Sequence, residues 1–204
     1  AQLALAVAPA AFTPPSEAQV ARAVVEARGH DLPTRLRMVT EPFLDAPYRH
    51  SPLGEGSGVD PDPLLRFDAF DCTTFVETAM ALALAEDLAH ARRILDVLRY
   101  REGKVDYLAR RHFPEAEWIP ELLRLGFLED ITRTIGGTEV RVEEKRLDAR
   151  VWHRARHPGM PALPAGPVRT VPVAWSRRVA AVQELIERLD ASAVAVWTAG
   201  NARH

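Results

Sequence analysis

The chain has 204 residues and a single cysteine, Cys72, so it can form no internal disulfide. No apolar run approaches the roughly 20 residues that cross a bilayer, and no transmembrane segment is predicted. The 26 Lys and Arg residues are balanced by 28 Asp and Glu, for a net charge of −2. Without a basic excess there is no electrostatic basis for binding nucleic acid, and we predict none.

The sequence also lacks the motifs of common metal and cofactor sites. The cysteine and the seven histidines are not spaced as zinc ligands. The glycines of "GEGSG" at 54–58 lie in a proline-rich segment without a following Lys-Ser or Lys-Thr pair, so they do not form a phosphate-binding loop. We therefore expect a protein without a metal or another cofactor.

What the chain does have is the composition of a folded protein, with 47% hydrophobic and 26% charged residues. This length fits one domain, which we predict over residues 16–204 after an extended segment at 1–15. The chain starts at Ala1, and "AQLALAVAPAAF" has the small, apolar character of the end of a signal peptide. A periplasmic or exported protein is expected, with a cytoplasmic one as the alternative. The sequence predicts no oligomeric state.

Three patterns in the first half predict helices. Ser16 and Gln19 form a capping box that opens a helix ending near Gly29. Residues 73–85 are apolar on almost every side, which predicts a buried helix, and residues 89–100 are amphipathic. The residues expected to face inward from the first and third of these helices are Val20, Val24, Val25, Ile94, Leu95 and Leu98.

The second half contains the predicted strands. Residues 47–63 hold four prolines and three glycines, which predicts a long loop of the kind that is often functional. Alternating or short apolar patterns predict strands at 103–113, 138–147, 168–175 and 192–197, with a further helix at 179–190. Because helices come mostly first and strands later, we predict an α+β fold.

Cys72 stands where the predicted buried helix begins, between Asp71 and Thr73. The unsatisfied amides of a first helical turn favour negative charge and therefore a thiolate. The same amides can hold the oxyanion of a tetrahedral intermediate. This setting favours a nucleophilic cysteine. The alternative is a small, buried and inert side chain, which is common for free cysteines.

A nucleophilic thiol needs an imidazole to take its proton. His112 follows a predicted strand and precedes "FPEAEW", and it is the candidate base; its alternative role is to pack at a sheet edge against Trp118. His50, in the long loop, is the second candidate. His204 is the last residue, and we expect it to be disordered.

Two strings carry a resemblance to a known family. They are "FDCTTFVET" at 70–78 with the preceding "PYRHSPLGEG" at 47–56, and "YREGKVDYLARRHF" at 100–113. Together they resemble the DUF1460 family of bacterial proteins, which are N-acetylmuramoyl-L-alanine amidase-like and related to NlpC/P60 cysteine peptidases. The likeness is strong over about residues 40–135 and weaker over 168–198.

The resemblance implies a papain-like, NlpC/P60-like α+β fold, with the nucleophile helix packed on an antiparallel sheet. It implies that Cys72 attacks an amide of a cell-wall muropeptide, that Asp71 holds the free amine of the substrate, and that Tyr48 faces the thiol. The alternatives are that Asp71 caps the helix and that Tyr48 anchors the loop.

The chain departs from the family at its end. Members usually continue into a stretch such as "HVGF", whose histidine is the expected base, whereas this sequence ends at "VWTAGNARH". We expect either a C-terminally truncated chain with an incomplete sheet, or a base supplied by His112 or His50. The alternative to an amidase is then a non-catalytic homologue that at most binds peptidoglycan peptides.

Overall fold

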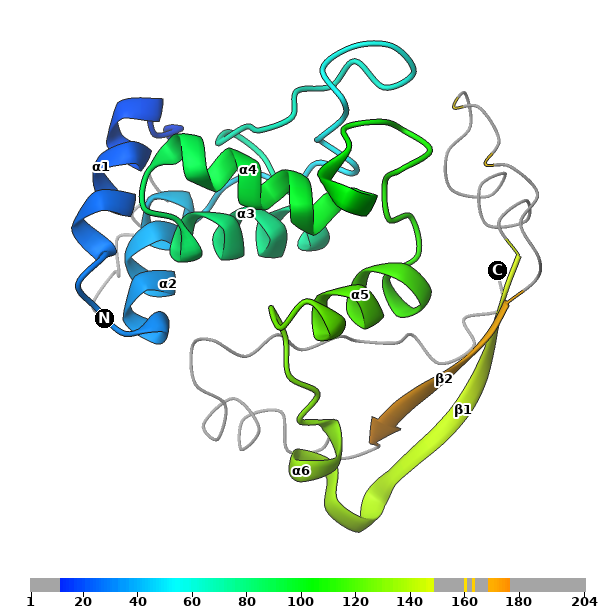
Figure 1. The fold of residues 1–204 in the computed structure, drawn as a ribbon. Coiled ribbons are helices and arrows are strands. Elements are labelled where there is room, and N and C mark those ends of the chain that lie inside the picture. The colour runs from blue at the N-terminus through cyan, green and yellow to red at the C-terminus, as the bar shows by residue number, and fades with distance from the viewer. Residues whose placement is uncertain (1–11, 149–159, 161–162, 164–168, 177–204) are drawn as a thin grey trace, which may run out of the picture.

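The computed structural model describes residues 12–148, 160, 163 and 169–176 (Figure 1). In chain order its elements are α1 (Glu17–Ala27), α2 (Leu32–Thr40), η1 (Glu41–Phe43), α3 (Cys72–Leu84), α4 (Leu88–Arg99), η2 (Arg101–Gly103), η3 (Pro114–Trp118), α5 (Ile119–Arg124), α6 (Thr132–Gly136), η4 (Gly137–Glu139), β1 (Val140–Leu147) and β2 (Arg169–Ser176). The predicted helix at 179–190 and strand at 192–197 lie outside the described residues.

The first helix forms as its capping box predicts. The Ser16 side chain accepts from the Gln19 amide, and the Gln19 side chain accepts from the Ser16 amide. Val20 and Val24 are buried, as expected, but Val25 is 49% exposed, so its predicted inward position is wrong. The buried stripe continues instead through residues four and seven positions after Val20.

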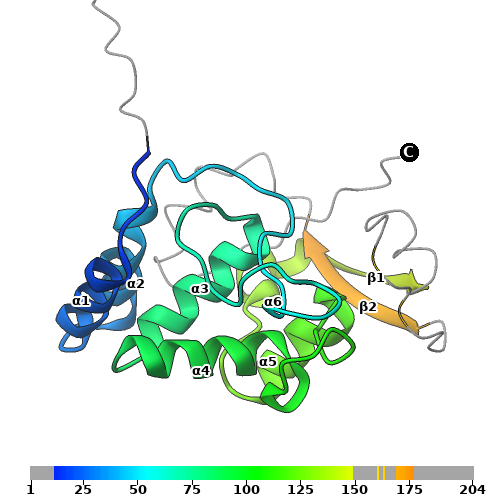
Figure 2. The ribbon, with the colours of Figure 1, turned by 90° about the horizontal axis from the view of Figure 1, so that it is seen from above.

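α3 is the central helix of the fold. It runs alongside α4, with α1 and α2 together at one end, as Figures 1 and 2 show. The prediction of a helix buried on nearly all sides is confirmed, since its residues from Glu77 to Ala83 are all buried. The amphipathic helix at 89–100 is confirmed as α4, with Leu95 and Leu98 fully buried.

Two apolar clusters surround α3. One joins it to α1, α2 and the loop after η1, where Phe43 packs against both Phe67 and Phe70. The other joins α3 to α4 and α5 around Trp118 and Leu122. The middle and end of α3 are therefore packed on two sides, while its first residues, Cys72 and Thr73, are exposed.

The strands at 138–147 and 168–175 are confirmed as β1 and β2. They pair antiparallel, from Val140 opposite Ser176 to Leu147 opposite Arg169. In the described part of the chain this two-stranded sheet lies mainly against α6 and η3, whereas α3 packs on α2 and α4. The described residues form a mixed helix-and-strand fold. Within them, the Cys72 helix packs on other helices and not on a sheet, and the papain-like arrangement stays a prediction.

The strand predicted at 103–113 is wrong. Glu102 and Gly103 have positive φ values of 56° and 65°, and the carbonyl of Asp106 accepts the amides of two residues that follow it, which closes a turn. Among the described residues, the ladder contact of this stretch is a single antiparallel bridge between Tyr100 and Arg110. Alternating residues make a strand only beside a second strand, and the described chain provides none here.

Of the helices in the described ranges, none has the length and hydropathy to cross a membrane.

Val24→Ala and Val25→Ala make a matched pair for the packing of α1. Val24 is fully buried and Val25 is half exposed. We expect Val24→Ala to lower the free energy of unfolding by about 2 kcal/mol and Val25→Ala by under about 0.5 kcal/mol. Urea unfolding of the two variants measures the difference. Equal losses would contradict the observed orientation of α1.

Candidate functional site

Cys72 is the first residue of α3 and its side chain is exposed. Its Sγ lies 3.9 Å from Oγ1 of Thr73, which is also exposed. The alternative of a buried, inert cysteine is therefore wrong. A thiol at the open end of a long buried helix is accessible to a substrate.

The helix begins at Cys72 because Asp71 caps it. Asp71 has an extended backbone, with φ −100° and ψ 178°, and its Oδ1 accepts from both the amide and the hydroxyl of Thr74 at 2.8 Å. The Thr74 hydroxyl in turn accepts from the Asp71 amide at 3.0 Å. This capping box fixes the direction in which the first turn points.

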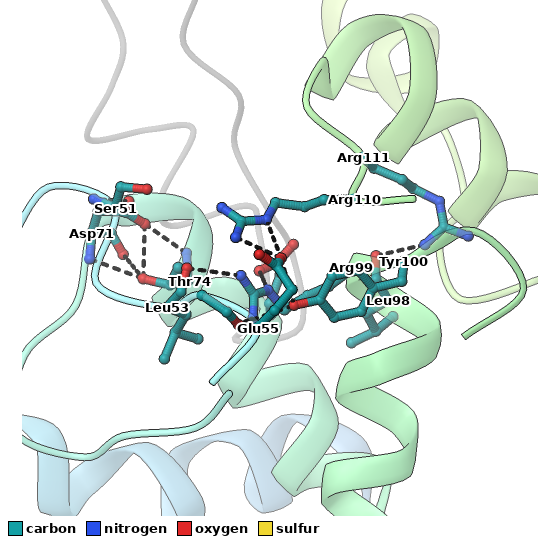
Figure 3. Close-up of polar contacts among 12 residues, drawn as sticks. Ser51, Leu53, Glu55, Asp71, Thr74, Leu98, Arg99, Tyr100, Arg110 and Arg111 are labelled. Atoms are coloured by element: carbon teal, nitrogen blue, oxygen red, sulfur yellow. Dashed lines mark hydrogen bonds and ion pairs between the residues drawn. The ribbon is translucent and has the colours of Figure 1, made fainter. Parts of the chain in front are cut away.

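The same carboxylate ties the long loop to the helix. Oδ2 of Asp71 accepts from the Ser51 amide at 3.0 Å (Figure 3). Next to it, Tyr48 and Phe70 form a parallel bridge, and the amide of Arg49 donates to the Phe70 carbonyl at 2.9 Å. The segment 48–51 therefore runs beside the residues that lead into Cys72.

The predicted site residues separate into two groups. Tyr48, Asp71 and Cys72 are brought together by these contacts, and Tyr48 is 70% exposed. His50 lies on the same docked segment and is also exposed. His112 lies elsewhere in the chain, just before η3.

His112 is held by its own segment. Its Nε2 lies 2.7 Å from the Tyr107 carbonyl, its ring meets the Tyr107 ring edge-on at 4.9 Å, and its amide donates to Glu117 at 2.9 Å. A ring nitrogen beside a carbonyl carries the proton, which fixes the tautomer of the neutral imidazole. These contacts place His112 in the turn before η3, half-buried.

A buried polar network that was not predicted from the sequence lies behind the loop. The buried guanidinium of Arg99, at the end of α4, faces Glu77 of α3 with Nε and Oε2 3.4 Å apart. Arg110 pairs with Glu55 at 2.6 Å and with Asp60 at 2.8 Å, all three nearly buried. The charges of "GEGSGVD" and "LARRHF" were a visible signal, but their pairing is long-range.

Burial dominates the electrostatics of the network. Loss of solvent raises the pKa of Glu77 to about 7, and the facing Arg99 opposes that rise. Burial likewise raises the pKa of the Tyr100 hydroxyl. Glu77 is thus the carboxyl group of this network that changes charge near neutral pH.

Among the described residues, no group of three or more His, Cys, Asp or Glu side chains is arranged to hold a metal ion. The site consists of a thiol, a carboxylate, a phenol and backbone amides. These groups can carry out acyl transfer or bind a polar ligand.

A family model described as AmiA-like, N-acetylmuramoyl-L-alanine amidase-like, matches residues 38–188. Among solved structures, a Legionella pneumophila protein of the DUF1460 family is similar, with a TM-score of 0.68 and 22% identity over 78% of this chain and 61% of that one. An N-acetylmuramoyl-L-alanine amidase from Bacteroides uniformis has a TM-score of 0.49 and 24% identity over 85% of this chain and 62% of its own. No curated protein matches the sequence. The chain thus spans less than two thirds of either solved protein.

Asp71→Ala tests whether the Asp71 carboxylate holds the long loop to the start of α3. The substitution removes the cap of α3 and the acceptor of the Ser51 amide, so we expect a loss of about 2 kcal/mol in the free energy of unfolding. Asp31→Ala is the control, because Asp31 caps α2 by accepting from the Thr34 amide, and about 1 kcal/mol is expected there. Urea unfolding compares them. If the Asp71 variant is as stable as the wild type, the carboxylate does not stabilise the contact between the loop and α3.

Proposed function

The chain belongs to the AmiA-like, N-acetylmuramoyl-L-alanine amidase-like family, and from this membership we propose that it hydrolyses an amide bond of cell-wall muropeptides with Cys72 as nucleophile. The observation that carries the proposal is the exposed thiol at the capped first turn of α3, inside the matched residues. The kinship to the wider NlpC/P60 peptidases stays a prediction. A substrate of this class also favours an exported or periplasmic location.

The reaction follows from the groups present. The thiolate attacks the carbonyl carbon, a C–S bond forms, and the carbonyl oxygen becomes an oxyanion. Collapse of this intermediate breaks the C–N bond, and the amine leaves with the proton that the base took from the thiol. Water then attacks the thioester, which releases the acid and restores the thiol.

The first turn of α3 supplies donors for the oxyanion. The capping contacts use the amides of Thr74 and Phe75, which bond to Asp71. The amides of Cys72 and Thr73 begin the helix and have no carbonyl within it to bond. They lie beside the sulfur, where the negative charge of a tetrahedral intermediate develops.

Asp71 keeps capacity for a substrate amine. An ionised carboxylate accepts at roughly four lone-pair positions. Three are used, by the Ser51 amide and by the amide and hydroxyl of Thr74. The remaining position, on Oδ2, is the one we assign to an ammonium group of the substrate. Tyr48, whose side chain is 70% exposed and whose backbone bridges Phe70, is the residue that we assign as a further donor to the oxyanion.

The base is a histidine in this proposal. His112 is the residue that the sequence favours, and its Nε2 lies 2.7 Å from the Tyr107 carbonyl. His50 is its competitor, because the segment that carries it is docked beside Asp71. A histidine of either origin would also return the proton to the leaving amine.

One observation favours the second candidate function, a non-catalytic protein that binds peptidoglycan peptides. Among the residues that the structure describes, the polar contact of the Cys72 sulfur is with the hydroxyl of Thr73, not with an imidazole. In that case Asp71 and Tyr48 would still bind a peptide, and no amide would be cut.

Cys72→Ala separates the two functions. We expect it to abolish release of the L-alanine amine from a muramoyl-L-alanine peptide, a loss of at least about a thousandfold in kcat/KM. Because the side chain is exposed, the free energy of unfolding should change by under about 0.5 kcal/mol. Thr73→Ala is the control and should keep most of the activity. Full turnover by Cys72→Ala would refute the nucleophile.

His112→Ala and His50→Ala identify the base. Removal of a general base costs about 10² to 10⁴ in kcat, so the base variant should fall that far and the other should stay within about twofold of the wild type. The rate of Cys72 alkylation by iodoacetamide from pH 5 to 10 is the second readout, and only the base variant should change its profile. If both variants stay active, neither histidine is the base.

A further inference from the structure

The loop between Tyr48 and Pro63 is held at two ends. On the side of the thiol, its Ser51 amide donates to Asp71. On the far side its backbone closes on itself, with the amide of Glu55 donating to the Asp60 carbonyl at 2.8 Å. A Cβ at Gly54 would overlap Asp60, so the closure needs glycine there. Residues 52–54 connect these two contacts, so their position affects the position of segment 48–51.

Arg99 reaches that stretch from α4. Its Nη2 donates to the Leu53 carbonyl at 3.1 Å and its Nη1 to the Gly54 carbonyl at 3.4 Å. Its Nε faces the carboxylate of Glu77 on α3, at 3.4 Å. The side chain is only 4% exposed. One planar group therefore contacts both the loop and the helix that begins with the nucleophile (Figure 3).

A second connection fixes the same carbonyl. The buried Tyr100 hydroxyl donates to Gly54 at 3.1 Å and lies 3.2 Å from Glu55. Glu55 is in turn paired with Arg110, which also binds Asp60. These contacts hold the loop to the turn after α4, but none of them reaches α3. Among these buried residues, Arg99 is the one that also faces the body of α3, whereas Asp71 holds the loop at the start of that helix.

We propose that Arg99 is a positioning residue, whose guanidinium sets the loop segment 48–51 against the first turn of α3 and so places Tyr48 and Asp71 for the substrate of Cys72. The predicted effect of Arg99 on hydrolysis rests on the proposed function. Its predicted effect on the position of the loop against α3 is independent of catalysis.

The chemistry of the guanidinium suits this role. Its donors lie in one rigid fork, so they can engage two carbonyls and a carboxylate at fixed angles, which a lysine ammonium cannot do. A buried ion pair such as that of Arg99 and Glu77 adds little net stability because desolvation opposes it, but breaking it is costly. The pair therefore acts to specify one arrangement of helix and loop.

The test compares Arg99→Met and Arg99→Lys with Arg92→Met. Arg92 lies on the same helix, but its side chain is 48% exposed and pairs with Glu17 on the surface. Amide hydrogen exchange followed by mass spectrometry reports the loop through peptides that cover 50–56, and α1 through peptides that cover 17–27. Hydrolysis of a muramoyl-L-alanine peptide and alkylation of Cys72 by iodoacetamide report the site.

We expect both Arg99 variants to speed exchange in the loop by at least about tenfold, with α1 unchanged. The value of kcat/KM should fall by at least about tenfold, since small misplacements of positioning groups have large effects on rate. Alkylation by the small iodoacetamide should stay within about twofold, because it needs only the thiol. Arg92→Met should match the wild type throughout.

Loop exchange at the wild-type rate in a folded Arg99 variant would overturn the proposal. So would a loosened loop with kcat/KM within about twofold of the wild type, because Arg99 would then be structural only. If Arg99→Met does not fold, Arg99→Lys, which keeps a charge opposite Glu77, is judged by the same criteria. If the wild type hydrolyses nothing, the amidase proposal fails, and loop exchange alone decides the positioning role.

Discussion

The carboxylate of Asp71 is the contact on which the site depends. It ends the long loop, caps α3 and accepts the Ser51 amide, with three hydrogen bonds of 2.8 to 3.0 Å. Because the cap fixes where the helix begins, it also fixes that Cys72 occupies the first turn. The Asp71 carboxylate therefore places the Cys72 thiol in the exposed first turn of α3, beside the amides of that turn. It also holds segment 48–51 next to this turn.

A second layer of polar contacts holds the parts that Asp71 joins. Buried charges are unfavourable unless each is paired, and the network behind the loop pairs Glu77 with Arg99 and places Arg110 between Glu55 and Asp60. Its carboxylates outnumber its guanidiniums. The raised pKa of Glu77, about 7, is the expected response of a buried carboxyl group in such a cluster. We infer that the network adds little to the free energy of unfolding and instead favours one conformation of the loop close to Cys72.

The sequence predicted what local rules decide. The Ser16 capping box, the apolar run of α3, the amphipathic α4 and the alternating strands β1 and β2 depend on residues a few positions apart, and all are found. Val25 was misplaced because two faces of α1 carry valine and only packing against other helices selects one. The strand predicted at 103–113 is wrong because, among the residues that the structure describes, its alternating pattern has no neighbouring strand to pair with.

Within the site, too, local contacts could be predicted from the sequence and long-range contacts could not. Cys72 and Asp71 are adjacent in sequence, and their roles at a helix start could be predicted from the residues alone. The resemblance implies that Tyr48 faces the thiol, and this role stays a prediction. The bridge between Tyr48 and Phe70 places the Tyr48 backbone beside the residues that precede Cys72. The contacts of Arg99 join residues 45 and 46 positions apart, and no local pattern predicts such a pairing.

The exposure of the thiol bears on the choice between catalysis and binding. A cysteine that only stabilised the start of α3 would gain by turning its apolar sulfur inward, toward the core that buries Thr74 and Glu77 on the same helix. Cys72 instead projects from the one place on that helix where the backbone favours an anion. A peptide-binding surface needs a carboxylate and a phenol there, but it has no use for a thiol beside unbonded amides. Acyl transfer uses that combination together with a histidine base, and on this ground we place hydrolysis ahead of binding.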